Sequence, residues 1–178
     1  MKNSILSIFA VAGIVAAAPV AQAQGYNPFE IGASGGIAFP TGDLSDAVGT
    51  GYNIAIHAGY KSQFMHIGIR AEAAWNQFSL DQGDGNANIP AFTGNVTYGL
   101  PMATGFSPYF IGGAGLYRPN VEFNGASSEA ENDFGWNVGG GIKIPLSGFE
   151  TFIEARYHSV STNGRTLSFV PLTVGITF

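Results

Sequence analysis

The side chains of this 178-residue chain that could do chemistry are three histidines, the serines beside one of them and a few charged residues, since the sequence has no cysteine. The lack of cysteine excludes disulfides, thiolate nucleophiles and thiolate metal ligands. His57, His66 and His158 have no second ligand at the spacing of a metal site. The expected strand pairing places His57 opposite Arg70. It places His66 opposite Lys61, and neighbouring cations repel a metal ion. We therefore predict neither a metal site nor a cofactor.

The run His158-Ser159-Val160-Ser161 could in principle supply a general base and a nucleophile. A general base must reach its nucleophile within about 3 Å. Neighbouring side chains of an extended chain point to opposite sides, so Ser159 points away from His158. Ser161 also points away from the imidazole while the strand continues. We predict no catalytic residue in this chain.

These residues lie in segments whose apolar side chains recur at every second position, which is the spacing of β-strands. In the segment from Phe29 to Phe39, Ile31 and Ile37 lie on one side and Glu30 on the other. Helical periodicity is absent from these segments. The sequence predicts eight strands, at 29–39, 52–61, 65–76, 92–100, 109–118, 133–144, 153–158 and 170–178.

The fifth segment is ambiguous, because three glycines within positions 112–115 blur its alternation. We place Tyr109, Ile111 and Tyr117 on its apolar side. In the last segment Pro171 lacks a backbone donor, so we place it at the outer rim, where water can satisfy the partner carbonyl.

The connections between the segments alternate in length, which predicts an antiparallel up-and-down topology. Short connections are expected at 62–64, 101–108 and 145–150, and long polar loops at 40–51, 79–90, 119–132 and 159–167. Short turns at one end, long loops at the other and an even strand count are typical of a transmembrane β-barrel of the bacterial outer membrane. The predicted fold class is therefore all-β, an eight-stranded antiparallel up-and-down barrel.

Alternation alone does not say which side of the wall faces the lumen, since a soluble barrel keeps its apolar side inside. The polar side of these segments carries mostly glycine, asparagine and threonine, whereas the outer face of a soluble barrel would be rich in lysine and glutamate. We therefore place the polar side in the lumen and the apolar side against lipid. A soluble periplasmic ligand-binding barrel is the alternative, and it requires the apolar side to point inward.

Charges enclosed in a lumen must be paired. We expect Lys143 and Glu154 to face each other across the sixth and seventh strands. The predicted interior polar network consists of Glu30, His57, His66, Arg70, Glu72, Lys143, Glu154, Arg156 and His158. Eight strands enclose a space that side chains can fill, so we expect no continuous pore.

Aromatic residues recur at both ends of single apolar faces, as Tyr52 and Tyr60 do. At roughly 3.3 Å per residue and a tilt near 40°, their separation spans about 20–25 Å, which matches the two interfaces of a membrane. The predicted membrane girdles consist of Phe29, Phe39, Tyr52, Tyr60, Trp75, Tyr109, Tyr117, Trp136 and Tyr157.

The first 23 residues have the features of a secretion signal. Lys2 precedes an apolar stretch, and Ala21-Gln22-Ala23 is a pattern that signal peptidase accepts. We predict a signal peptide at 1–23, cleavage after Ala23 and a mature barrel domain at 24–178. Loss of Lys2 leaves six basic against twelve acidic residues, a formal charge of −6, which argues against nucleic acid as a partner.

Several stretches resemble the small outer-membrane β-barrel family that includes the opacity-type proteins and the barrel of outer-membrane protein A. They are Phe39-Pro-Thr-Gly-Asp-Leu-Ser45, Pro108-Tyr-Phe-Ile-Gly-Gly-Ala-Gly-Leu-Tyr117, Gly139-Gly-Gly141, Glu154-Ala-Arg-Tyr157 and the terminal Phe178. The resemblance implies that Phe178 is the assembly signal read by the outer-membrane insertion machinery. It also implies contact with outer-membrane lipid and lipopolysaccharide.

The same resemblance brings an enzymatic alternative, because some eight-stranded outer-membrane barrels hydrolyse lipid A acyl chains with a His-x-Ser pair on a lipid-facing strand. Here Val160 stands two residues after His158, so the pattern is not met.

The long loops carry most of the mature charge. Eight acidic residues lie in or beside them, against Arg118 and Arg165. These acids are Asp43, Asp46, Asp81, Asp84, Glu122, Glu129, Glu131 and Asp133. Cation binding is one interpretation, but the stretch from Asp81 to Asn88 lacks the closing glutamate of a calcium loop. We expect a structural, adhesion or surface-interaction role through four acidic extracellular loops, which could bind an extracellular partner.

Overall fold

Eight long strands and three short elements make up the part of the chain that the computed structural model describes, residues 28–62, 64–80, 85–100, 105–123, 126–127, 132–162 and 164–178. The long strands are β1 (Phe29–Thr41), β2 (Val48–Lys61), β3 (Ile67–Leu80), β4 (Gly85–Gly99), β5 (Ser107–Tyr117), β8 (Asp133–Leu146), β9 (Phe149–Thr162) and β10 (Arg165–Thr177). The short elements are the 3-10 helix η1 (Gly42–Asp46) and the strands β6 (Asn120–Phe123) and β7 (Ala126–Ser127). The predicted signal peptide and its cleavage site lie outside the described residues.

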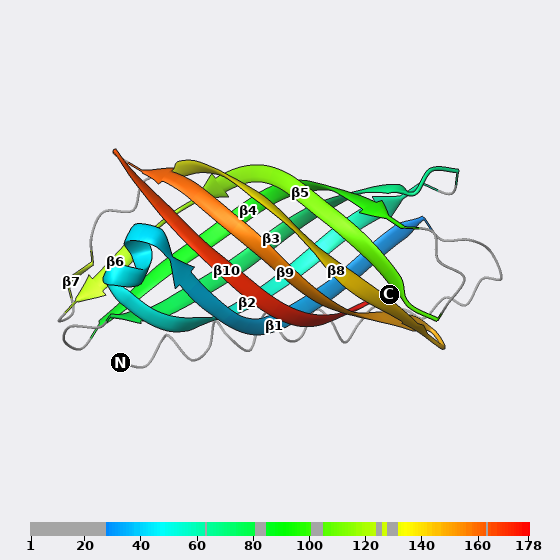
Figure 1. Cartoon of the computed structure of the whole chain (residues 1–178), viewed down its shortest axis with the longest axis horizontal. Coiled ribbons are helices and arrows are strands. Elements are labelled where there is room, and N and C mark those ends of the chain that lie inside the picture. The colour runs from blue at the N-terminus through cyan, green and yellow to red at the C-terminus, as the bar shows by residue number, and fades with distance from the viewer. Residues whose placement is uncertain are drawn as a thin grey trace.

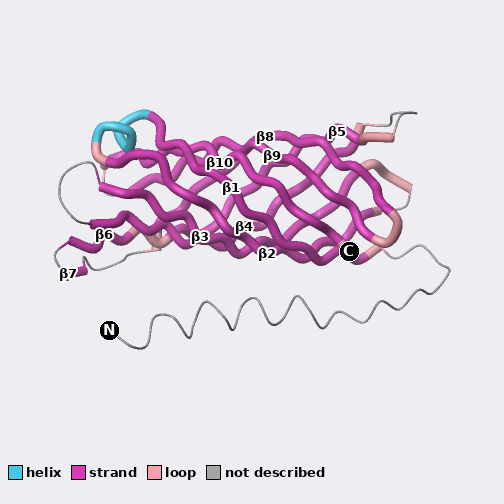
Figure 2. Tube along the Cα trace, turned by 90° about the horizontal axis from the view of Figure 1, so that it is seen from below, coloured by secondary structure: helices cyan, strands magenta, loops and turns pink. Residues whose placement is uncertain are grey.

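The long strands form one closed antiparallel barrel. They pair in the order β3-β2-β1-β10-β9-β8-β5-β4, and β3 also pairs with β4, which closes the sheet on itself. Figures 1 and 2 show these strands winding obliquely around a common axis. The predicted eight-stranded up-and-down barrel is confirmed. Among the described residues, no helix is long and apolar enough to cross a membrane.

The two ends of the barrel differ. At one end, here called the turn end, lie the last residues of β2, β4 and β8, the first residues of β3, β5 and β9, and Phe178. At the other end, here called the loop end, lie η1, β6 and β7 (Figure 1). β6 pairs with the first residues of β4 and extends the sheet past the rim of the barrel.

The barrel wall has its apolar side outward along most of its length. Ile31, Ile54, Ile69, Val96 and Val174 are all exposed on the outer surface. The inward positions between them carry the charged and amide side chains, and most of these are buried. Exposed apolar groups on this scale need lipid to cover them. This arrangement overturns the alternative of a soluble barrel with an apolar lumen.

Toward the loop end the polarity of the wall reverses. The inward residues there are apolar, and the outward ones, such as Gln77, Ser79 and Ser161, are polar. The buried apolar cluster at this end consists of Ala38, Leu44, Val48, Phe78, Ala87, Ile89, Ala91, Tyr117, Val160 and Phe169. Leu44 reaches this cluster from η1. The loop-end part of the barrel is therefore arranged like a soluble protein, with polar residues facing water and an apolar core inside.

This reversal corrects two of the predicted loops. The segments 79–90 and 159–167 are mostly strand, because β3 runs to Leu80 and β4 begins at Gly85, while β9 runs to Thr162 and β10 begins at Arg165. The pairing continues across the change of polarity, since backbone hydrogen bonds do not depend on which side of the wall is apolar. The polar composition of these segments reflects exposure to water and not a lack of strand.

The predicted orientation of the fifth strand was wrong. Tyr109, Ile111 and Tyr117 point into the lumen and are at most 4% exposed, whereas Phe110 and Leu116 are on the outer surface. Tyr109 pairs with Gly141 of β8, whose missing side chain leaves space inside for the ring. The inward tyrosines fill space in the lumen that the glycines of β8 leave open.

Pro171 also lies elsewhere than predicted. It pairs with Ala38 of β1 in the middle of β10 and not at the rim of that strand. On the other side of β10 the pairing with β9 passes from Phe169 to Leu172 without partners at 170 and 171. This is where the ladder accommodates a residue without a backbone N–H.

Candidate functional site

The centre of the lumen is filled by an ionic network around Glu154. Its carboxylate accepts a hydrogen bond of 2.9 Å from Arg70 Nη1, one of 2.6 Å from the Tyr109 hydroxyl and an ion-pair contact of 2.8 Å from Arg156 Nε. Arg156 Nη2 also bonds Glu72. Two cations and two anions from β3 and β9 therefore neutralise each other across the lumen, with side chains that are 6% exposed or less.

A second ionic cluster lies at the turn end. The Lys143 ammonium contacts Glu30 at 3.1 Å and Glu150 at 3.3 Å. The expected pairing of Lys143 with Glu154 was wrong, because the register places Gly141 opposite Glu154 and Lys143 opposite Phe152. Glu150 is not among the residues predicted for the interior, although it shares the inward parity of Glu154 on the same strand.

The histidines on the first hairpin do not face the residues predicted for them. His57 pairs with Glu72 and not with Arg70, and Lys61 pairs with Gly68. His66 lies exposed in the turn before β3. The turn is longer than predicted and shifts the register by two positions. His57 Nε2 lies 3.2 Å from the Thr177 hydroxyl.

His158 points into the lumen, as expected, and its ring belongs to the packing at the loop end. Its Nδ1 lies 2.8 Å from the Tyr117 hydroxyl, and its ring stacks on Phe169 at a centroid distance of 4.9 Å. Ser159 is on the opposite side of the strand, where it is 8% exposed. The imidazole and this hydroxyl are thus separated by the barrel wall and are not arranged as a base and its nucleophile.

Aromatic rings that pack against glycine backbone on the neighbouring strand fill much of the remaining lumen. Phe152 lies opposite Gly175, where an added Cβ would come within 2.3 Å of the ring. At Gly141 an added Cβ would meet the Tyr109 ring at 2.8 Å. Arg70 lies over both rings, 5.5 Å from the Phe152 centroid and 5.8 Å from that of Tyr109. The inward glycines of the sixth predicted strand were the sequence signal for large inward partners.

A layer of amides lies between the ionic network and the apolar cluster. Asn53 donates to Asn76 at 2.7 Å, and Asn137 donates to Asn95 at 2.9 Å. Among the described residues, no group of three or more histidine, aspartate or glutamate side chains is arranged to hold a metal ion.

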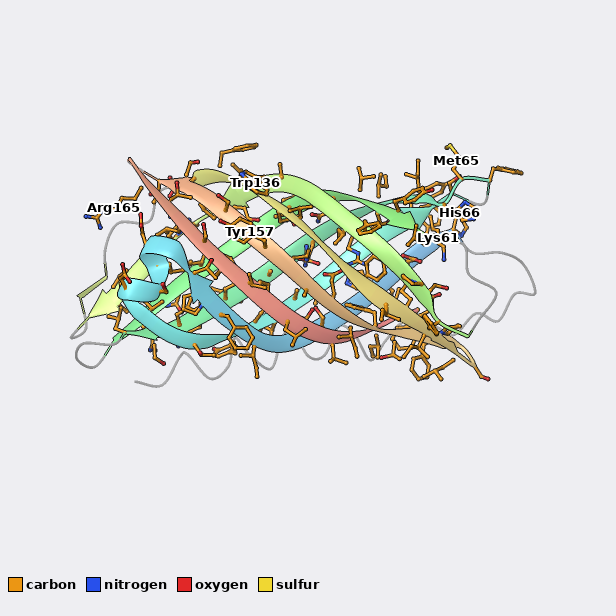
Figure 3. The ribbon with its side chains drawn as sticks, viewed as in Figure 1. Lys61, Met65, His66, Trp136, Tyr157 and Arg165 are labelled. Atoms are coloured by element: carbon orange, nitrogen blue, oxygen red, sulfur yellow. The ribbon has the colours of Figure 1, made fainter. Side chains whose placement is uncertain are left out.

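The aromatic residues predicted for the girdles fall into two groups. Tyr109 and Tyr117 are in the lumen, so their assignment to the membrane surface was wrong. The other seven are exposed on the outer wall, and they are Phe29, Phe39, Tyr52, Tyr60, Trp75, Trp136 and Tyr157. Figure 3 shows Trp136 and Tyr157 on the outside of the ribbon toward the loop end, and their ring centroids are 5.7 Å apart.

A cavity of about 480 Å³ lies at the turn end. Its walls include both carboxylates that hold Lys143, and Tyr109 is among its deeper lining residues. Lys61 and His66, which Figure 3 shows at this end of the barrel, line it as well.

Charged side chains at the loop end point into solvent. Asp43, Asp46 and Glu122 are exposed, as are Arg118 and Arg165. Asp133 is partly buried at the start of β8. The remaining predicted loop acids, Asp81, Asp84, Glu129 and Glu131, lie outside the described residues.

Three solved structures with the same fold illustrate its range. Neisserial surface protein A has a TM-score of 0.70 at 16% identity, covering 86% of this chain and 97% of that one. The attachment invasion locus protein Ail of Yersinia pestis, in complex with the heparin analogue sucrose octasulfate, has a TM-score of 0.53 at 16% identity, covering 85% and 100%. The outer membrane enzyme PagL has a TM-score of 0.51 at 11% identity, covering 84% and 98%.

At these identities the likeness shows the fold alone. The comparison with curated protein sequences found no match. A family model described as the outer membrane protein beta-barrel domain matches residues 7–178, nearly the whole chain. The chain belongs to this family of outer-membrane β-barrel proteins.

Proposed function

We propose that this protein is a barrel without an open pore that acts through its loop end, as a surface platform for an extracellular partner. The observation that carries the proposal is that two separate groups of side chains fill the lumen. The ionic network around Glu154 occupies the centre, and the apolar cluster around Phe78 and Phe169 occupies the loop end. Eight strands leave little lumen beyond what such side chains fill.

The loop end supports this role because its connections are carried on paired strands over a packed apolar core. Beyond the lipid-facing belt the wall continues as paired strand over an apolar core, and Leu44 anchors η1 to that core. Connections held at both ends by paired strand lose less conformational freedom on binding than unsupported ones, which favours recognition.

The charge of the loop end favours a basic partner. Asp43, Asp46 and Glu122 are exposed there, and the loop sequences add further acids. The heparin analogue bound to Ail is a polyanion, and the same ligand would be repelled by an acidic rim. We infer that this barrel selects partners of the opposite charge.

The proposed orientation places the turn end in the periplasm and the loop end outside the cell. The connection between β5 and β8, 118–132, lies at the loop end and is longer than the connections of the turn end, which supports this orientation because periplasmic turns are short. In this orientation the aromatic belt around Trp136 and Tyr157 meets the outer leaflet, where lipopolysaccharide is the proposed lipid partner.

Hydrolysis of lipid A is the alternative that the PagL likeness raises. The geometry speaks against it, because His158 is in the lumen and Ser159 is on the outer side of the wall. No described feature of the lipid-facing surface favours this activity over a platform role.

The test is binding of the folded barrel in lipid nanodiscs to surfaces coated with polylysine or heparin. We expect binding to polylysine that weakens at least several-fold in the variant Asp43→Asn, Asp46→Asn, Glu122→Gln. A matched control, Glu150→Gln at the turn end, should bind like the unmodified protein. Preference for heparin, or equal loss in the control, would overturn the proposal.

A further inference from the structure

The cavity at the turn end differs from the lumen deeper in the barrel, because among its described lining residues Tyr109 is the one large aromatic side chain. Deeper in the barrel, inward glycines are covered by Tyr109 and Phe152. At the turn end Gly99 lines the open space, and an added Cβ there would meet nothing closer than 3.8 Å. A volume of about 480 Å³ is within the range of small-molecule sites.

The cavity is also blind. Tyr109, among its deeper lining residues, donates to Glu154, and the ionic network lies directly behind that contact. Any solute therefore enters and leaves at the turn end. A site of this kind binds and releases a ligand and does not conduct it.

The lining carries two carboxylates and two lysine ammonium groups, so its formal charges balance. Glu30 and Glu150 approach from β1 and β9 and hold Lys143 between them. Lys61 and His66 come from the end of β2 and the turn that follows it. With two glutamates against two lysines, neither a simple anion nor a simple cation gains a net attraction.

Neutral hydrogen-bonding groups complete the lining. The hydroxyls of Thr97 and Ser107 come from β4 and β5, and they can donate to or accept from a ligand. Glu150 is the more accessible carboxylate of the pair, since its side chain is 30% exposed against 18% for Glu30. It can meet a ligand ammonium while Glu30 keeps its contact with Lys143.

From this arrangement we propose that the turn-end cavity is a binding site for small zwitterions, the class of amino acids and short peptides. The ligand ammonium binds at Glu150, and its carboxylate binds at Lys61 with help from the Thr97 and Ser107 hydroxyls. In the orientation proposed above this site faces the periplasm.

The experiment is an NMR titration of the folded full-length mature chain in detergent micelles, with backbone amides as the readout. The probes are glycine and glycylglycine, and the larger shift at equal concentration distinguishes a free amino acid from a peptide. We expect saturable shifts at the amides of Gly68, Thr97, Gly99 and Ser107. Ethylamine and sodium acetate, which carry one charge each, should need about tenfold higher concentrations.

Two variants locate the site, and a third controls for general effects. Glu150→Gln and Lys61→Gln should each weaken the response to the zwitterion about tenfold. Arg165→Gln, an exposed position at the loop end, should leave it unchanged. A heat-dependent mobility shift on a gel shows that each variant is folded. The proposal is overturned by an absence of saturable shifts, by equal responses to ethylamine or acetate, or by equal effects of all three variants.

Discussion

Single glycines and aromatic rings fill the lumen of this barrel as matched pairs. Because Gly175 has no side chain, the Phe152 ring can lie against its backbone on β10, and the Tyr109 ring lies in the same way against Gly141 of β8. A Cβ at either glycine would overlap a ring, and rings packed this tightly can move little.

Gly175→Ala should therefore lower the free energy of unfolding by about 1–3 kcal/mol, the cost of overpacking a filled interior. The measurement is urea unfolding in lipid vesicles, followed by tryptophan fluorescence. Gly94→Ala is the matched control, since its added Cβ has nothing within 4 Å on the outer wall. Equal effects of the two substitutions would show that the ring contact does not matter.

Glu154 joins two arginines that are buried in the lumen, so its loss should cost more than that of a surface acid. Glu154→Gln leaves Arg70 without a carboxylate, while Arg156 keeps its contact with Glu72. We expect a loss of about 3–5 kcal/mol in the same unfolding measurement. Glu122→Gln, on the surface, should change it by less than about 0.5 kcal/mol.

A companion variant separates loss of charge balance from loss of packing. If the unpaired arginine is the cause, Arg70→Gln combined with Glu154→Gln should recover part of the lost stability. A double variant that is as unstable as the sum of both single variants would contradict this interpretation.

At this scale the sequence predicted which side chains are inside better than it predicted which ones meet. Alternation placed Arg70, Glu72 and Glu154 in the lumen correctly. The partners depend on register, and a hairpin turn two residues longer than expected moved His57 from Arg70 to Glu72. Parity within one strand carries no information about that length.

At the scale of the elements, each long strand crosses from one solvent to another. β3 has lipid-facing Ile69 and Trp75 over inward Arg70, and then outward Ser79 over inward Phe78. The strand itself is continuous, so the change of side marks the boundary of the lipid belt.

An arginine scan along the outer wall should map this boundary. Val174→Arg, in the middle of the belt, should cost about 2–4 kcal/mol, because the charge meets hydrocarbon. Ser161→Arg, beyond Tyr157, should cost about 1 kcal/mol or less, because the side chain meets water. The measurement is again unfolding in vesicles, and equal costs at both positions would contradict a boundary between them.

The middle part of each strand, where the outward residues are apolar, could be predicted from the sequence. The extensions of the strands at the loop end could not. Segments such as 79–90 look like loops because their outward residues are polar and their alternation runs opposite to that of the belt. A period-two pattern with reversed polarity is still a strand, provided that the environment changes along it.

On the scale of the whole molecule, the last strand closes the barrel. Phe178 N–H donates to the carbonyl oxygen of Ile31 at 2.8 Å, and its ring lies 6.0 Å from that of Phe149. The backbone contact continues the ladder between β1 and β10 and does not involve the ring.

Phe178→Ala keeps this backbone pairing and removes the terminal aromatic ring that the family resemblance identifies as the assembly signal. We expect a several-fold lower amount of the heat-modifiable form in the outer-membrane fraction. Phe149→Ala, which removes the other ring of the contact, should leave the amount unchanged. An equal decrease in both variants would point to ring packing and not to a signal.

We expect the folded barrel to conduct no ions along its axis, and its conductance in a planar lipid bilayer measures this. Preparations that show the heat-modifiable, folded form on gels should produce no discrete conductance steps, because the ionic network and the apolar cluster both fill the lumen. Stable, reproducible channel openings by the unmodified protein would show instead that the lumen is open from end to end.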